Sequence, residues 1–208
     1  MKFVLLVEGH TERKAVPEFL KRWLDQRLPQ PIGIKTIRFD GWQQLYKDVE
    51  QKTRLVLDAP NNDVVAVIAL LDLYGPTFYP ADKISAADRY AWAKQAIEQR
   101  VGDSRFRQYF AVHKLEAWLL SNPSIFPVEI RPAIKLISNP ESKNFDEPPA
   151  KLLDNLYSTR LNRNFAKITH GTNLFRQLDP SDAASKCPYL AGMLYDMLQL
   201  AQGAQRPA

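Results

Sequence analysis

The segment Asp63-Val64-Val65-Ala66-Val67-Ile68-Ala69-Leu70-Leu71-Asp72 decides the fold, because eight apolar residues run without a break and end at an aspartate. An apolar run of this length is typical of a parallel strand that is buried on both faces. Lys2–Val7 has the same character. Two further strands are expected at residues 32–39 and 107–112.

Helical patterns lie between these strands and after them. Apolar residues recur at helical spacing over residues 11–28, 42–57, 85–101 and 189–201. Pro17 fits the first helix only if that helix begins near it or is distorted in an early turn. Alternating strands and helices predict right-handed βαβ units. We therefore expect an α/β fold whose sheet is mostly parallel and has about four strands.

The second half of the chain has a different character, with frequent prolines between short helical patterns. We expect residues 1–122 to form the α/β core. Residues 123–208 should form a helical extension packed on it, either as a separate unit or within the same compact domain. The polar, proline-rich segment 139–149 is predicted to be an exposed loop.

The composition is that of a globular protein in the cytoplasm. The chain has 208 residues, of which 45% are hydrophobic and 25% charged. No apolar run approaches the roughly 20 residues that span a bilayer, so no membrane partner is expected. The single cysteine, Cys187, excludes an internal disulfide and is predicted to be a small buried residue.

Positive charge is concentrated in one segment. The net charge is +5, and residues 158–176 hold no acid. Basic residues mixed with aromatic ones suit a nucleic-acid backbone, although a solvated face that balances acids elsewhere is an equal alternative. The residues concerned are Arg160, Arg163, Lys167, His170 and Arg176, with Phe165 and Phe175 among them.

Three acids follow the ends of separate predicted strands: Glu8, Asp72 and Glu116. The carboxyl ends of parallel strands meet at one edge of a sheet, where ligands bind. Converging carboxylates repel one another unless a cation lies between them. Mg²⁺, or Mn²⁺, is the expected ion, because it prefers oxygen ligands and can stabilise the charge that develops on a phosphate.

Glu12 would join this group if a helix starts directly after Gly9, with Thr11 as a possible cap. A structural alternative exists for each acid. Glu12 could simply complement the positive start of the helix, and Glu116 could do the same in a later helix. Asp72 could mark the exit of a strand into solvent.

The motif Val7-Glu8-Gly9-His10-Thr11-Glu12 resembles the first motif of TOPRIM domains, especially those of overcoming-lysogenization-defect (OLD) nucleases. Leu71-Asp72 is similar to the start of the second TOPRIM motif, Asp-x-Asp. The chain also looks like a bacterial TOPRIM-like family of unknown function, which continues with Glu-Ala-Trp-Leu-Leu, a late lysine, a His-Gly pair and a Cys-Pro pair. Here these are residues 116–120, Lys167, 170–171 and 187–188.

This resemblance implies a Rossmann-like TOPRIM core that binds Mg²⁺ and cuts or rejoins nucleic acid, in bacterial defence or DNA processing. Glu8 and Asp72 would be its first metal-binding acids, and Glu12 would serve a second metal. Tyr74 departs from the pattern, because it replaces the second aspartate of Asp-x-Asp. Either Glu116 or a nearby acid such as Asp82 would supply the missing charge, or the site is weaker than in known nucleases.

Basic residues could complete a catalytic site. Lys167 could stabilise the charge of a phosphoryl transition state, and His170, three residues later, could act as an acid or base from the same helical face. His170 could instead belong to a turn. His113 and Lys114 are second-rank candidates, and His10 is expected to be a loop residue.

Three functional hypotheses follow. The first is a metal-dependent nuclease with Glu8, Asp72, Glu116 and Lys167 in its catalytic site. The second is a catalytically weak module that binds nucleic acid or a partner. Since the chain lacks a G-x-x-x-x-G-K-[ST] motif, a separate ATPase is a plausible partner. A nucleotide-binding protein ranks last, because no glycine-rich loop follows the first strand.

Overall fold

The computed structural model describes residues 1–60, 63–142 and 148–205. Within them, four strands form one parallel sheet: β1 (Lys2–Val7), β2 (Gly33–Arg38), β3 (Val64–Asp72) and β4 (Phe106–Ala111). Their order is β2-β1-β3-β4, and every neighbouring pair is parallel. The expected α/β fold with a parallel sheet is therefore confirmed.

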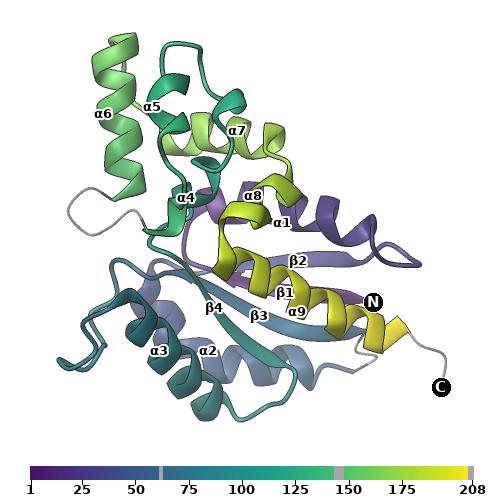
Figure 1. The fold of residues 1–208 in the computed structure, drawn as a ribbon. Coiled ribbons are helices and arrows are strands. Elements are labelled where there is room, and N and C mark those ends of the chain that lie inside the picture. The colour runs from purple at the N-terminus through teal and green to yellow at the C-terminus, as the bar shows by residue number, and fades with distance from the viewer. Residues whose placement is uncertain (61–62, 143–147, 206–208) are drawn as a thin grey trace.

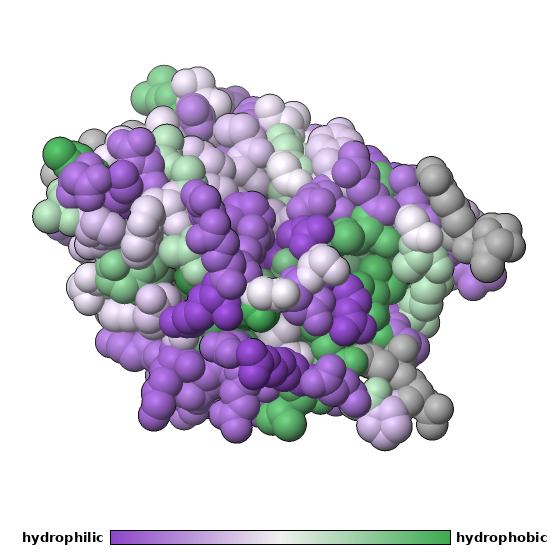
Figure 2. All heavy atoms as spheres, turned by 90° about the horizontal axis from the view of Figure 1, so that it is seen from below, coloured by the Kyte–Doolittle hydropathy of each residue, from purple (hydrophilic) through white to green (hydrophobic). Residues whose placement is uncertain are grey.

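Helices cover both faces of the sheet (Figure 1). α1 (His10–Asp25) and α9 (Pro188–Gln205) lie on one face, and α2 (Trp42–Leu57) and α3 (Ala86–Val101) lie on the other. Seen from the α2 and α3 side, the surface is mostly hydrophilic with apolar side chains between (Figure 2). This is the expected result for helices that bury one face and solvate the other.

The remaining helices are short and gather on the α1 side of the sheet, in the upper part of Figure 1. They are α4 (Glu116–Leu119), η1 (Pro123–Ile125), α5 (Arg131–Lys135), η2 (Pro140–Ser142), α6 (Pro149–Leu161), the π-helix η3 (Lys167–Gly171), α7 (Thr172–Gln177) and α8 (Pro180–Lys186). No helix in the described residues has the length and apolar character that a bilayer crossing requires.

One hydrophobic core is shared by the two segments that the sequence separates at residue 122. Phe19 of α1 stacks on Trp118 of α4 and meets Phe175 of α7 edge-on. Met193 and Met197 are buried in the same cluster, as is Cys187. The extension and the sheet are therefore packed together through apolar side chains.

Two local expectations need correction. α1 begins at His10 and continues through Pro17, so the alternative of a helix that begins near this proline is wrong. The buried face that includes Val16 and Phe19 stabilises a helix that lacks one backbone hydrogen bond. Within the segment 139–149, Pro140 and Glu141 are buried in η2 and not exposed. Residues 143–147 lie outside the described part.

The chain leaves the two central strands toward opposite faces. After β1 it enters α1 on one face, and after β3 it reaches α3 on the other. A sheet with this order has a switch point between β1 and β3, where a crevice forms at the carboxyl ends of the strands. The topology thus places the residues after β1 and β3 side by side.

Candidate functional site

Glu8 and Asp72 meet at the switch point. The backbone N–H of Asp72 donates a hydrogen bond to Oε1 of Glu8 at 3.2 Å. Glu8 directly follows β1, and Asp72 is the last residue of β3. Two acids that are 64 positions apart in sequence therefore occupy neighbouring strand ends.

The chain segment after β4 holds the Asp72 carboxylate from two sides. Oδ1 accepts the backbone N–H of Leu115 at 3.0 Å, and Oδ2 lies 3.1 Å from Nζ of Lys114. Asp72 is 7% exposed. A buried carboxylate with one amide donor and one ammonium partner is well compensated, so its orientation is fixed.

Glu12 lies in the first turn of α1 and is 5% exposed. Its position depends on Gly9, which precedes the helix in an extended conformation. A Cβ at Gly9 would lie only 1.9 Å from Oε2 of Glu12. Glycine is thus required for close approach and not for a left-handed turn. Thr11 does not cap α1, because Gly9 occupies the cap position without a side-chain hydrogen bond.

Glu116 and Lys167 complete the cluster. Glu116 begins α4 and is 2% exposed, and its Oε1 lies 3.1 Å from Nζ of Lys167. The same Nζ is 3.9 Å from Oε1 of Glu12. Lys167 comes from the π-helix η3, which packs against α1. One ammonium group thus lies between two buried acids.

A cavity of about 440 Å³ opens onto this cluster. Its lining contains three of the acids and both lysines, together with Trp42, Tyr74 and Ile168. Glu116 does not line the cavity, but it forms an ion pair with Lys167, which does. The lining residues are Glu8, Gly9, His10, Thr11, Glu12, Trp42, Asp72, Tyr74, Gly75, Lys114, Lys167 and Ile168.

The electrostatics of the cavity reflect an excess of acid. Burial, followed by the charge of Asp72, raises the pKa of Glu8 above its ordinary value and that of Glu12 to about 7. Burial alone would lower the pKa of Lys167, but the attraction of Glu116, Asp72 and Glu12 outweighs it, so the pKa is raised. Four carboxyl groups face two ammonium groups, which is the charge imbalance expected of a cation-binding site.

The donor chemistry suits Mg²⁺ or Mn²⁺. Oε2 of Glu12 and Oε2 of Glu116 are buried, and neither accepts a hydrogen bond within the described residues. Hard divalent cations prefer such oxygens. As arranged, however, no three His, Cys, Asp or Glu side chains in the described ranges are grouped to hold a metal ion. Binding would require Glu12 and Glu116 to exchange the Lys167 ammonium for the ion.

Tyr74 replaces the second aspartate of the Asp-x-Asp motif, and either Glu116 or Asp82 was expected to supply the missing charge. Glu116 lies at the site, and Asp82 does not. Asp82 is solvent-exposed and pairs with its neighbour Lys83 at 2.7 Å. Tyr74 lines the cavity and is 38% exposed.

The other four basic residues of the segment 158–176 do not line the cavity with Lys167. His170 turns away from the acids and lines a separate hollow, where its ring stacks on Tyr157 and its Nδ1 accepts the N–H of Ala166. Arg163 lies over the Tyr157 ring. Arg160 is exposed at the end of α6, and Arg176 lies 4.0 Å from Glu18. Lys167 and His170 therefore do not share a face.

Sequence reasoning ranked Lys114 too low and did not single out Trp42. Lys114 binds Asp72, and Trp42 is the first residue of α2, at the carboxyl end of β2. Ligands bind at the carboxyl ends of parallel strands, and this rule located the acids. Applied also to the segment that follows β2, the rule would have found Trp42. His10 was expected in a loop, but it is the first residue of α1, where it is exposed and lines the cavity. Burial lowers the pKa of His113.

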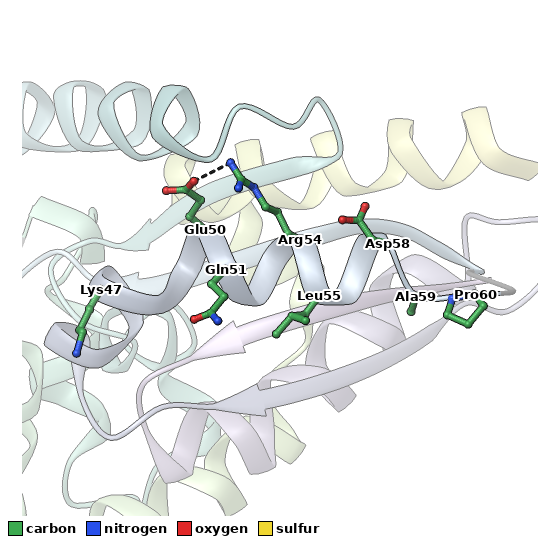
Figure 3. Close-up of a pocket in the computed structure, with 8 residues that line it drawn as sticks. All are labelled: Lys47, Glu50, Gln51, Arg54, Leu55, Asp58, Ala59 and Pro60. Atoms are coloured by element: carbon green, nitrogen blue, oxygen red, sulfur yellow. Dashed lines mark ion pairs between the residues drawn. The ribbon is translucent and has the colours of Figure 1, made fainter.

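A larger hollow of about 710 Å³ runs along α2, but its chemistry is different (Figure 3). Its lining comes from one helix and the turn that follows. Glu50 and Arg54 face each other there as an exposed ion pair at 2.8 Å. The lining residues are Lys47, Glu50, Gln51, Arg54, Leu55, Asp58, Ala59 and Pro60. Because it lacks buried acids from separate strands, the switch-point cavity is the better candidate site.

Comparisons with known proteins give a family and two distant structural relatives. The C-terminal region of the Burkholderia pseudomallei OLD protein is 15% identical, with a TM-score of 0.49 over 96% of this chain and 98% of that chain. The C-terminal region of the Xanthomonas campestris pv. campestris OLD protein is 18% identical, with a TM-score of 0.45 over 97% and 94%. No curated protein gives a significant match. The model of the domain of unknown function DUF4276 matches residues 7–198, so the chain belongs to the DUF4276 family.

Proposed function

We propose that this chain is a divalent-cation-dependent enzyme that hydrolyses phosphodiester bonds of nucleic acid. The observation that carries the proposal is the convergence of four carboxyl groups and two ammonium groups at the switch point. The acids come from three separate chain segments, and three of them are almost fully buried. Burying this much charge is costly unless the site serves a ligand.

The residues of the chain fit distinct roles in such a reaction. Glu8 and Asp72 would hold the cation, together with Glu12 and Glu116. When bound, the cation would neutralise phosphate oxygens and make a bound water more acidic. Lys167 carries a positive charge at the same place and would stabilise the charge that develops on the phosphate.

The resemblance of the first motif to the OLD nucleases adds support for this chemistry and for a setting in defence or DNA processing. The net charge of +5 also favours a polyanionic substrate.

The test is cleavage of end-labelled DNA and RNA by the purified chain with Mg²⁺ or Mn²⁺, compared with chelator. We expect Glu8→Gln and Asp72→Asn to lower the rate by at least about 100-fold. Asp82→Asn is the matched control, because it removes an exposed acid that does not line the cavity, and it should retain full activity. Cleavage that persists in the Glu8→Gln/Asp72→Asn double variant would refute the proposal.

A second function is a partner-binding module whose metal site has been lost. It is favoured by Tyr74 at the position of a second aspartate and by the lack of a preformed three-acid group in the described residues. A separate ATPase would be its partner. Calorimetric titration with Mg²⁺ separates the two functions, because the module would release no binding heat and the enzyme would.

A further inference from the structure

The lining of the cavity includes three large side chains that the hydrolytic chemistry does not use. Trp42, Tyr74 and Ile168 line it together with the acids and lysines. Tyr74 is 38% exposed and Ile168 is 46% exposed, which is unusual for large apolar side chains beside so many charges. Trp42 is half-buried. Phosphate and a cation need no such surface, so a different part of the ligand should contact it.

Trp42 is held in place by packing beneath it. It follows Gly41, whose φ of 89° turns the chain into α2, and it meets the ring of Phe78 edge-on at 5.6 Å. Phe78 is in turn stacked on Tyr46 at 4.5 Å. A ring supported in this way loses little conformational entropy when a ligand stacks on it.

Tyr74 is connected to Asp72 through the side chain of Lys114. Nζ of Lys114 lies 5.5 Å from the centre of the Tyr74 ring and 3.1 Å from Oδ2 of Asp72. The aromatic surface is thus one side chain away from a carboxylate of the proposed reaction centre.

The size of the cavity limits which ligands can contact both its charged and its aromatic residues. A volume of about 440 Å³ falls in the range of small-ligand pockets. It admits one nucleotide with its base out of the stack, and a base-paired duplex is too large to enter. Aromatic side chains bind unpaired bases of any sequence, because every base has a flat face.

We propose that Trp42 and Tyr74 form a stacking platform for one unpaired base, so that the site selects single-stranded nucleic acid over duplex. This proposal rests on the proposed function, since it takes the substrate to be nucleic acid. It adds a contact surface for the base beside the acids and assigns specificity for strandedness to two aromatic residues. The acids and lysines act on the phosphate next to that base.

The test measures binding of a fluorescent 12-nucleotide DNA strand to the full chain at low salt in Ca²⁺. Three ligands are compared: the single strand, the same strand with abasic sites throughout, and the duplex. We expect the single strand to bind at least about 10-fold more tightly than either other ligand, and Trp42→Leu to weaken it by about 5- to 100-fold. Trp92→Leu is the matched control, because Trp92 also packs near Phe78, at 6.3 Å, but does not line the cavity.

Tyr74→Ala provides a second variant at an exposed position, in case Trp42→Leu fails to fold. Equal affinity for the abasic and normal strands would overturn the platform, as would equal losses in Trp42→Leu and Trp92→Leu. Preferential single-strand binding without any cleavage would support the platform and refute the nuclease. Cleavage that is unaffected by abasic sites and by Trp42→Leu would leave the nuclease intact and overturn the platform. Failure to bind any of the three ligands overturns both.

Discussion

Replacing Glu12 with glutamine should stabilise the protein in the absence of divalent cations. Glu12 is 5% exposed, and burial and the charge of Asp72 raise its pKa from 4.5 to about 7. Its Oε2 accepts no hydrogen bond within the described residues, and its Oε1 is 3.9 Å from the Lys167 ammonium. Glutamine has the same shape and carries no charge, so the substitution removes the cost of ionisation without leaving a cavity.

The magnitude follows from the difference in pKa between the folded and unfolded states. A raised pKa means that the folded protein binds the proton more tightly, so stability is greatest below pH 4.5 and falls as the pH rises to 7. Each pKa unit corresponds to about 1.4 kcal/mol. Ionised Glu12 therefore lowers the free energy of unfolding by about 3 kcal/mol at pH 8 and by less than about 1 kcal/mol at pH 5.

Urea denaturation in chelator at pH 5 and pH 8 measures this difference. We expect Glu12→Gln to gain about 3 kcal/mol at pH 8 and under about 1 kcal/mol at pH 5. Glu18→Gln is the control on the same helix, because its side chain is 57% exposed, and it should change stability by less than about 0.5 kcal/mol. A gain that is the same at both pH values, or a loss at pH 8, would refute the reasoning.

Three further predictions concern neighbouring features. Gly9→Ala would force a Cβ against Glu12 and should cost about 1–3 kcal/mol in urea denaturation; an unchanged midpoint would mean that Glu12 moves freely. Lys114→Met leaves the buried Asp72 without its ammonium partner and should lower the free energy of unfolding by about 1–2 kcal/mol in chelator. Adding Mg²⁺ should restore part of this stability, and no recovery would argue against a cation site. Glu141→Ala removes the acceptor of two backbone N–H groups at the start of α9 and should cost about 2 kcal/mol at pH 5. Because burial raises the pKa of Glu141 to about 7, its contribution is lost as the pH rises past 7, so a deficit that grows between pH 5 and pH 8 would contradict this assignment.

The sheet was predictable because its signals are local. The apolar runs of β1 and β3 and the helices between them appear in the structure within a few residues of the expected bounds. Their parallel arrangement then follows from general rules of chain connection. The same rules placed Glu8 and Asp72 at adjacent strand ends, although no sequence spacing links them.

Features that depend on distant partners were not predictable. Glu141 lies in a polar, proline-rich segment, and it is buried only because α9 offers the N–H groups of Tyr189 and Leu190. The π-helix that contains both Lys167 and His170 has no sequence signature, so the spacing of an ordinary helix wrongly put both on one face. In each case tertiary contact decides the conformation, and local propensity does not.

The opposite exits of the chain from β1 and β3 have a consequence for how this protein can change. The gap between these exits is produced by the connectivity of the backbone, so no side chain has to keep it open. Exposed residues that border it, such as Tyr74 and Ile168, can be exchanged without disturbing the interior, while the framework persists. New specificities can therefore arise at this position by substitution alone, which makes it the part of the molecule where related chains should diverge in chemistry first.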